Sequence, residues 1–256
     1  MHGGKKAIVA KYGIEMGSAA IGTAFEFAAP GMGPMVAAGV SVALEEFLSR
    51  SLSRKERARV GSLGAMARER ISAALLAGRQ LRADDFFAVG ESGEPPSVEL
   101  FEASLLKARD EPEAKKLVFI AAFYANLLFT EGLSPDTAHS FLNTLQRVTF
   151  RQICLLSFVA QEGELDVKKL RTDGRSIPEI LSLAREEMDL QSNDLGTLGL
   201  LEASSPWRSR LTPLGRMLVE LAALNEVEPA DLARLRSTLN EVERNGVPRD
   251  ANASGL

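Results

Sequence analysis

An uncharged and mostly apolar stretch fills residues 117–130, between Lys116 and Glu131. Its apolar residues fall on every side of a 3.6-residue period, which is typical of a helix buried on all sides. As a helix the stretch would be about 21 Å long, too short for a bilayer core of about 30 Å. The pattern therefore predicts the central helix of a protein core, around which the rest of the chain is organised.

Turn and capping residues delimit this helix and the next one. Asp110–Glu113 combines a cap residue, an early Pro and an acid at the third helical position, which indicates a helix start. Gly132 indicates the end of the buried helix, and Ser134–Pro135 the start of a second helix that continues to Val148. Residues 83–148 are therefore expected to form a helical core.

The first 48 residues form a Gly- and Ala-rich apolar segment. Between Met16 and Leu44 the only charged residue is Glu26, and Pro and Gly residues at 30–34 divide the segment into two arms. Small residues recur every four positions, a spacing that lets two helix backbones approach closely. Each arm is roughly 15 residues, or about 22 Å, so neither spans a bilayer alone.

Two interpretations of this apolar hairpin stay open. The first is a buried helical hairpin within a soluble fold, and the second is a segment that enters a membrane as a re-entrant hairpin or by oligomerising. Because Gly-rich helices are intrinsically weak, either protein or lipid must hold the arms. The candidate hairpin residues are Gly17, Gly22, Phe25, Phe27, Pro30, Gly31, Gly33, Pro34 and Met35.

Residues 49–82 are predicted to form a basic amphipathic helix. Nine Lys and Arg residues and two acids fall between residues 50 and 82, alongside an apolar stripe. Long basic side chains beside such a stripe can reach anionic headgroups, and the same charges can contact nucleic-acid phosphates. A solvated face that docks on the acidic part of the chain is the alternative. The candidate membrane or anion contacts are Arg50, Arg54, Arg57, Arg59, Arg68, Arg70 and Arg79.

Residues 149–256 follow the pattern of a winged-helix module. Cap signals predict helices over 150–161, from 179 to about 189, and over 191–202. A small β-hairpin follows, with all strand expected near 204–212, and two further helices complete the chain. The wing residues are Trp207, Arg208 and Arg210.

The charge of the third predicted helix bears on what this module binds. A winged helix that reads DNA needs cationic side chains around its third helix. Residues 191–202 hold two acids and no base, and only Arg208 and Arg210 could reach phosphate. The sequence therefore predicts a protein-interaction or regulatory module without sequence-specific DNA binding. A winged-helix transcription regulator is the alternative.

Composition narrows the functional classes further. The 256 residues are 45% apolar and 25% charged, as in ordinary globular proteins. Residues 1–82 carry 12 basic and 6 acidic residues, whereas residues 83–256 carry 18 basic and 28 acidic residues. A polyanionic partner is therefore expected to bind residues 1–82. One Cys excludes an intrachain disulfide and fits a reducing cytoplasm, and with two His it argues against a structural zinc site. No nucleotide-binding or nucleophile motif is present.

The order of these segments resembles the abortive-infection alpha family of bacterial proteins. The matching parts are residues 17–44 with their Pro-Gly break, residues 113–129, and residues 195–202 followed by 211–221. The resemblance implies a role in phage defence, with membrane association, and it assigns no site residue.

We therefore expect an all-α protein, a multi-helix bundle with an N-terminal Gly-rich hairpin and a C-terminal winged-helix-like module. Its expected function is that of a non-enzymatic effector or interaction protein, membrane-acting in phage defence, without metal or cofactor. A soluble helical scaffold is a further alternative. The expected partners are an anionic membrane surface and a protein, or a second copy of the chain. The expected location is the cytoplasm or the periphery of the inner membrane.

Overall fold

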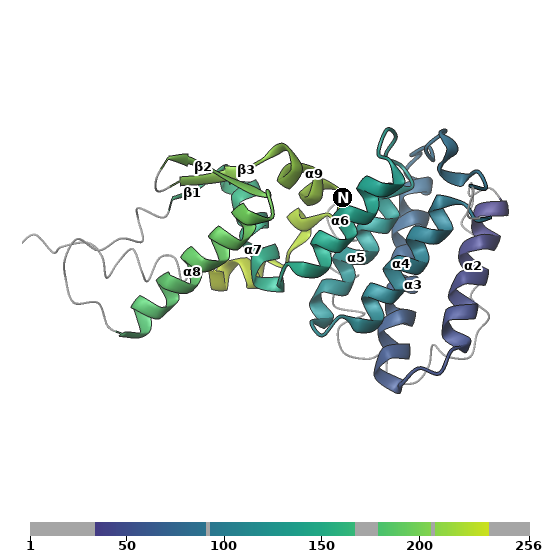
Figure 1. Cartoon of the computed structure of the whole chain (residues 1–256), viewed down its shortest axis with the longest axis horizontal. Coiled ribbons are helices and arrows are strands. Elements are labelled where there is room, and N and C mark those ends of the chain that lie inside the picture. Colours follow the sequence, from purple (N-terminus) through teal and green to yellow (C-terminus); the bar gives the residue numbers. More distant parts are fainter. Residues whose placement is uncertain (1–33, 91–92, 167–178, 206–207, 236–256) are drawn as a thin grey trace, which may run out of the picture. The chain divides into compact units, whose positions relative to one another are not determined.

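The computed structural model describes residues 34–90, 93–166, 179–205 and 208–235, and this part of the chain is mostly helical, as expected (Figure 1). Contacts within the chain define two compact units. Unit 1 consists of Met1–Phe150 and Leu221–Ala223, and unit 2 of Arg151–Glu220 and Leu224–Leu256. Each unit is described by itself below.

Unit 1 is a helical bundle. Helix α3 packs against both α4 and α5, and α2 packs mainly against α4. Figure 1 shows α2 and α3 joined at their lower ends by a short connection, so they run in opposite directions. The elements are α2 (Pro34–Ser49), α3 (Arg54–Leu76), η1 (Asp85–Phe87), α4 (Pro96–Asp110), η2 (Ala114–Lys116), α5 (Leu117–Leu127) and α6 (Pro135–Arg147).

Helix α3 begins with a capping box. The Ser53 side chain accepts a hydrogen bond from the Glu56 backbone N–H at 3.3 Å, and the Glu56 carboxylate accepts one from the Ser53 N–H at 2.7 Å. Further along, α2 passes close to the helix, because a Cβ atom at Gly64 would lie only 2.9 Å from the Leu44 side chain. The predicted apolar stripe is buried at Val60, Leu63, Ala67 and Ile71.

Helix α5 is the predicted central helix. Nine of its eleven residues are buried, and the Tyr124 ring lies 4.8 Å from that of Phe101 on α4. Its predicted start is wrong, because Asp110 is the last residue of α4. The chain turns through η2 and enters α5 only at Leu117. The predicted start of α6 is confirmed, since the Ser134 hydroxyl accepts a hydrogen bond from the Thr137 N–H at 3.2 Å.

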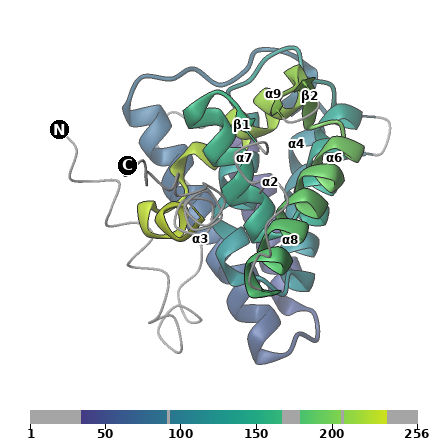
Figure 2. The same cartoon turned by 90° about the vertical axis from the view of Figure 1, so that its left-hand side faces the viewer.

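Unit 2 combines helices with a small antiparallel sheet. Its strand order is β1-β3-β2, so β3 is central and pairs with both neighbours. Helices α7 and α8 lie side by side in both views (Figures 1 and 2), and Arg151 contacts Glu187 at 3.2 Å between them. The elements are α7 (Phe150–Glu162), β1 (Leu165–Asp166), α8 (Glu179–Thr197), β2 (Leu201–Ser205), β3 (Arg208–Leu211), α9 (Pro213–Leu221) and η4 (Leu224–Glu226).

Two predictions for unit 2 are corrected. Residues 179–189 and 191–202 do not form separate helices, because α8 continues through Ser192 to Thr197 and is followed by β2. Ser192 is buried together with Met188 and Leu195. These three residues are four and three positions apart, so they share the packed side of one helix. Strand is also not confined to 204–212, since β1 forms at Leu165–Asp166 and β2 begins at Leu201.

Candidate functional site

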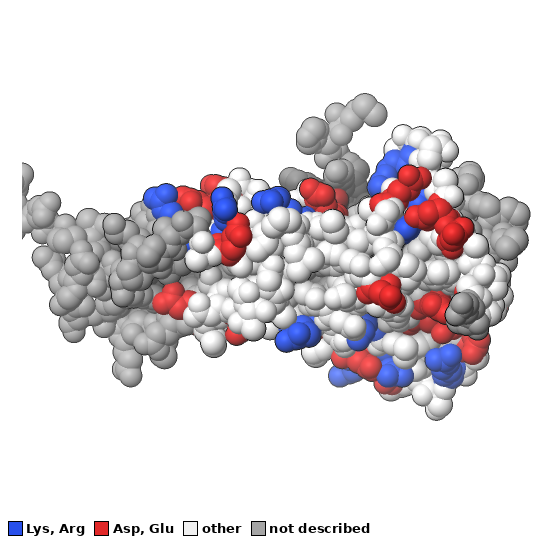
Figure 3. Space-filling view, turned by 45° about the horizontal axis from the view of Figure 1, so that its top comes forward, with Lys and Arg blue, Asp and Glu red and all other residues white. Residues whose placement is uncertain are grey.

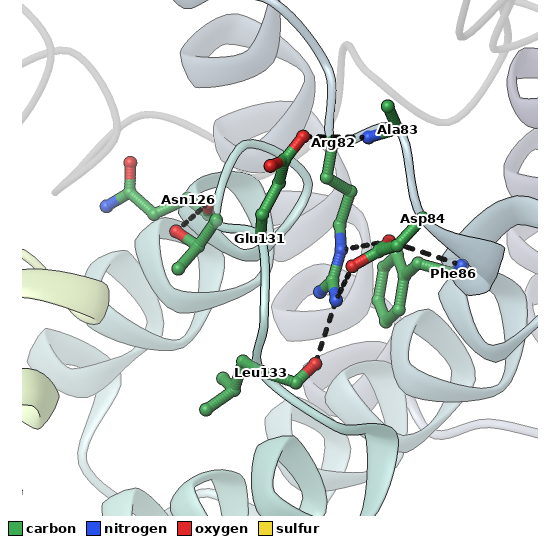
Figure 4. A network of polar contacts seen from close by, with 8 residues as sticks. Arg82, Ala83, Asp84, Phe86, Asn126, Glu131 and Leu133 are labelled. Atoms are coloured by element: carbon green, nitrogen blue, oxygen red, sulfur yellow. Dashed lines mark hydrogen bonds and ion pairs between the residues drawn. The ribbon is translucent and has the colours of Figure 1, made fainter.

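The basic stretch ends at Arg82, which is buried and not available to a ligand (Figure 4). Its guanidinium donates two hydrogen bonds to the Asp84 carboxylate, at 2.6 and 2.5 Å, and one to the Leu133 carbonyl at 2.8 Å. The same group lies 4.2 Å from the centre of the Phe86 ring. The planar, forked guanidinium suits such a set of contacts, which fixes the connection after α3 against the turn before α6.

Asp84 takes part in both the ion pair and a helix start. Its side chain accepts a hydrogen bond from the Phe86 N–H at 3.4 Å, at the beginning of η1. Hydrogen bonds from Arg82 hold the pKa of the Asp84 carboxyl below its usual range. The carboxylate is therefore ionised at neutral pH, as the pairing with Arg82 requires.

Three of the predicted anion contacts are held by the protein itself. Arg59 donates a hydrogen bond to the Arg109 carbonyl at 2.8 Å. Arg79 donates to Oδ1 of Asn126 at 3.3 Å, and Arg50 pairs with Glu46 at 3.3 Å. Arg59 and Arg79 therefore connect different elements of unit 1, and Arg50 pairs with a residue four positions before it.

The other predicted contacts on α3 differ in exposure. Arg54 is exposed, and Arg57, Arg68 and Arg70 are partly exposed. Neither Arg57 nor Arg68 forms an ion pair with another residue that the structure describes. They are eleven residues apart, which is about three helical turns, so they lie on the same side of α3. A Cβ atom at Gly61, one turn after Arg57, would meet no atom within 4 Å.

We call Arg57, Gly61 and Arg68 the Arg57–Arg68 strip. Its three positions are partly exposed, and its two arginines form no ion pair with another described residue. On the face of the molecule shown in Figure 3, basic and acidic side chains alternate, and neither charge covers a broad area. The strip itself consists of three residues of α3.

The hairpin residues Gly17, Gly22, Phe25, Phe27, Pro30, Gly31 and Gly33 lie outside the described residues. Pro34 is the first residue of α2, and Met35 follows it in the same helix. None of the helices in the described part of the chain combines the length and apolar character needed to cross a membrane.

A buried ion pair near the start of α5 was not predicted. The Lys116 ammonium group lies 2.7 Å from the Glu111 carboxylate and donates a hydrogen bond to the Gln146 carbonyl at 2.8 Å. The Glu113 carboxylate accepts a hydrogen bond from the Phe150 N–H at 3.1 Å. The available signal was the position of Lys116 directly before a mostly buried helix, where a buried charge needs a partner.

The two wing arginines that the structure describes are paired with acids. Arg208 contacts Glu164 at 3.1 Å, and Arg210 contacts Glu202 on the neighbouring strand at 2.7 Å. Trp207, the third predicted wing residue, lies outside the described ranges. The charge that these arginines could offer to a phosphate is therefore already partly neutralised within the sheet.

Helix α8 presents an apolar side chain among acids. Leu190 is 57% exposed. Glu187 precedes it by three positions and Asp194 follows by four, so both adjoin it on the helix surface. Sequence reasoning missed this feature because it placed the end of the helix at Asp189.

A scan of protein-family models matched none to this chain, and searches of curated proteins and of solved structures also found no match.

Proposed function

We propose that the chain is a non-enzymatic interaction protein whose unit 2 is a winged-helix-like module that binds protein. The observation that carries this proposal is the order of elements around the sheet. A short strand after α7 pairs with β3, and β3 pairs with β2 to form the hairpin that follows α8. Winged-helix modules likewise place a strand after the first helix and a helix immediately before the wing.

The charge of that helix favours protein over DNA. In a winged helix the helix before the wing enters the major groove, which here is α8 and not residues 191–202. Between Glu179 and Thr197 there are five acids and one base, Arg185. A helix of net charge −4 is repelled by phosphates, and the wing arginines are paired.

Leu190 is the residue that we expect to anchor the partner. An apolar residue packed into a pocket supplies affinity. Of the flanking acids, Glu187 is already paired with Arg151, whereas the partner of Asp194 is the neutral Gln152 amide, so the charge of Asp194 favours a basic surface. We therefore propose a basic protein segment with an apolar side chain that covers Leu190.

The test compares two exposed leucines of unit 2 in a screen for interacting proteins with the full chain as bait. Leu190→Asp is expected to lose the partner, whereas Leu214→Asp on α9, at a position 44% exposed, is expected to keep it. In parallel, the full chain is incubated with a pool of randomised duplex DNA. Enrichment of one sequence, with affinity that falls as salt rises, would contradict the proposal and support the transcription-regulator alternative.

A second candidate function is binding of the N-terminal part of the chain, residues 1–82, to an anionic membrane. It is favoured by Arg57 and Arg68, which lack ion pairs within the described ranges, and by the apolar composition of the first 48 residues. Each basic residue near an anionic leaflet contributes about 1 kcal/mol. Flotation with phosphatidylserine vesicles tests it, and failure to float in both the intact chain and a chain without residues 13–48 would exclude it.

Phage defence is the biological role that we propose for this interaction protein, on the resemblance given above. Bacteria that express the chain are expected to plate fewer phage than matched cells that express the Leu190→Asp variant. Equal plating across a panel of phages would contradict the role but would leave the protein-binding proposal for unit 2 standing.

A further inference from the structure

The sequence after α9 favours a longer helix than the one that forms. The residues that follow Leu221 are Ala, Ala, Leu, Asn, Glu and Val, with good helix formers among them and no Gly or Pro before Pro229. Helix α9 nevertheless ends at Leu221, and Ala223 has a φ of 51°. A left-handed helix end is usually occupied by glycine, because the Cβ of any other residue crowds the backbone there. Contacts from elsewhere in the fold therefore impose this break.

The contacts come from α5. The side-chain amide of Asn126 donates a hydrogen bond to the Leu221 carbonyl oxygen at 2.9 Å. The three residues Leu221–Ala223 are buried, and they belong to unit 1, whereas the chain on both sides of them belongs to unit 2. The break in the helix thus coincides with a short piece of chain that packs in unit 1.

The orientation of the Asn126 amide is set by Arg79. Arg79 donates a hydrogen bond to Oδ1 of Asn126 at 3.3 Å, and its guanidinium lies 4.6 Å from the centre of the Phe129 ring. A guanidinium can only donate and a backbone carbonyl can only accept. The amide oxygen therefore faces Arg79, and the amide nitrogen is left to face Leu221.

One carbonyl group connects this hydrogen bond to the break. In a helix that continued past Leu221, the N–H of residue 225 would donate to the Leu221 carbonyl, four positions before it. The left-handed residue at 223 interrupts that path, and the last carbonyls of a helix then need other partners. Asn126 supplies the partner for Leu221, so its amide stabilises the chain in the interrupted form.

We propose that Leu221–Ala223 is a latch with two states. In the latched state Asn126 binds the Leu221 carbonyl and the chain turns at Ala223. In the released state α9 continues as one helix to Val227 and stops before Pro229, since the residue that precedes a proline disfavours helix.

The latch controls how the two units are connected. The chain passes between the units at 150–151, 220–221 and 223–224. In the released state residues 221–223 become part of the continued helix of unit 2, so the last two crossings disappear. The units are then joined by the chain at 150–151 alone. Nothing in the latch depends on what unit 2 binds, so this proposal and the protein-binding proposal succeed or fail separately.

Opposing terms make two states accessible. The latched state keeps the Asn126 hydrogen bond and the burial of Ala222 and Ala223, and it carries the strain of a left-handed alanine. The released state gives up that burial and gains helical hydrogen bonds in a stretch of good helix formers. Glycine at position 223 would remove the strain and favour the latched state, because glycine adopts positive φ readily.

Solution NMR of the full chain tests the latch through two NOE signals. A positive φ brings the amide and α protons of one residue close together, so a strong NOE within Ala223 reports the latched state. NOEs from residue 221 to residue 225 report the continued helix. Asn126→Asp removes the donor while keeping the size of the side chain. It is expected to lose the strong NOE within Ala223 and to gain the NOEs from 221 to 225.

Two further variants complete the experiment. Asn143→Asp, the same change at an exposed position of α6, is the matched control and should keep the parent signals. Addition of Ala223→Gly to Asn126→Asp is expected to remove the NOEs from 221 to 225 again. If Asn126→Asp does not fold, Arg79→Ala replaces it, because it removes the orienting donor from an exposed position outside the helices.

Three outcomes would overturn the proposal. The first is a folded Asn126→Asp or Arg79→Ala chain that keeps the strong NOE within Ala223, because the amide then does not hold the break. The second is loss of that NOE without new NOEs from 221 to 225, since the segment is then irregular and not helical. The third is a released signal in Asn143→Asp, or in Asn126→Asp with Ala223→Gly.

Discussion

The carboxylate of Glu111 and the ammonium group of Lys116 lie 2.7 Å apart, with both side chains only 2% exposed. Glu111 also accepts a hydrogen bond from the Glu113 N–H at 3.0 Å, and Lys116 donates to the Gln146 carbonyl. Removal of two charges from water is costly, and the remaining donors and acceptors must be satisfied for such a pair to persist. These additional bonds connect the turn after α4 to the end of α6.

Loss of one partner of this pair is expected to destabilise unit 1. Lys116→Met leaves the Glu111 carboxylate buried without its cation and should cost about 3–5 kcal/mol in unfolding free energy. The double variant Glu111→Gln with Lys116→Met should cost less than Lys116→Met alone. Urea denaturation followed by circular dichroism measures both, and a double variant that is less stable than the single one would contradict the ion-pair argument.

Replacement of Arg82 by Lys tests the geometry of the guanidinium separately from its charge. Lys keeps the positive charge but cannot bond both Asp84 and Leu133 in the same way. We expect a loss of about 2–4 kcal/mol in unfolding free energy. Arg147→Lys, at an exposed position near the end of α6, serves as control and should change stability by less than about 0.5 kcal/mol.

The pH dependence of stability should change in Asp84→Asn. The folded state lowers the pKa of Asp84 from its ordinary value of 3.8, chiefly through the hydrogen bonds from Arg82. The unfolded chain thus binds this proton more readily. The stabilisation is complete above the unfolded pKa and is lost as the pH falls through the lower folded pKa.

Acid titration of the unfolding free energy between about pH 6 and pH 2 should therefore be less steep in Asp84→Asn than in the parent chain. Asp85→Asn changes the neighbouring exposed carboxyl and is the matched comparison. If the unfolding free energy falls equally steeply with decreasing pH in the parent and in Asp84→Asn, the ion pair with Arg82 adds no pH-dependent stability.

Local signals in the sequence located several helices of both units. Ser134 caps α6 as predicted, and the uncharged stretch after Lys116 forms α5. Gly163 follows α7 with a φ of 85°, in the left-handed region that favours glycine. These features depend on neighbours in the chain, which is why the sequence indicates them directly.

The features that were missed depend on distant contacts. Strand β1 has two residues, too few to show alternation, and it exists because it pairs with β3 more than forty residues later. Ser192 has a capping side chain but is buried within α8, where packing of the helix outweighs its preference for a helix start. The burial of Arg82 likewise requires the carbonyl of Leu133.

The close approach between α9 and Leu200, the residue before β2, should not tolerate a side chain at Gly215. A Cβ atom there would lie 2.1 Å from the Leu200 carbonyl oxygen and 3.2 Å from the Leu211 side chain. The backbone oxygen cannot move without disturbing the start of β2. Gly215→Ala is therefore expected to destabilise unit 2 by about 1–3 kcal/mol, the usual range for overpacked sites.

Gly196→Ala is the matched control for this prediction. A Cβ atom at position 196 would lie 3.9 Å from the Leu201 carbonyl oxygen, an ordinary contact, and alanine is the better helix former by about 1 kcal/mol. Gly196→Ala should therefore leave stability unchanged or raise it slightly. Urea denaturation followed by circular dichroism measures both variants. Equal midpoints for the two variants would show that α9 shifts freely away from Leu200 and that position 215 does not require glycine.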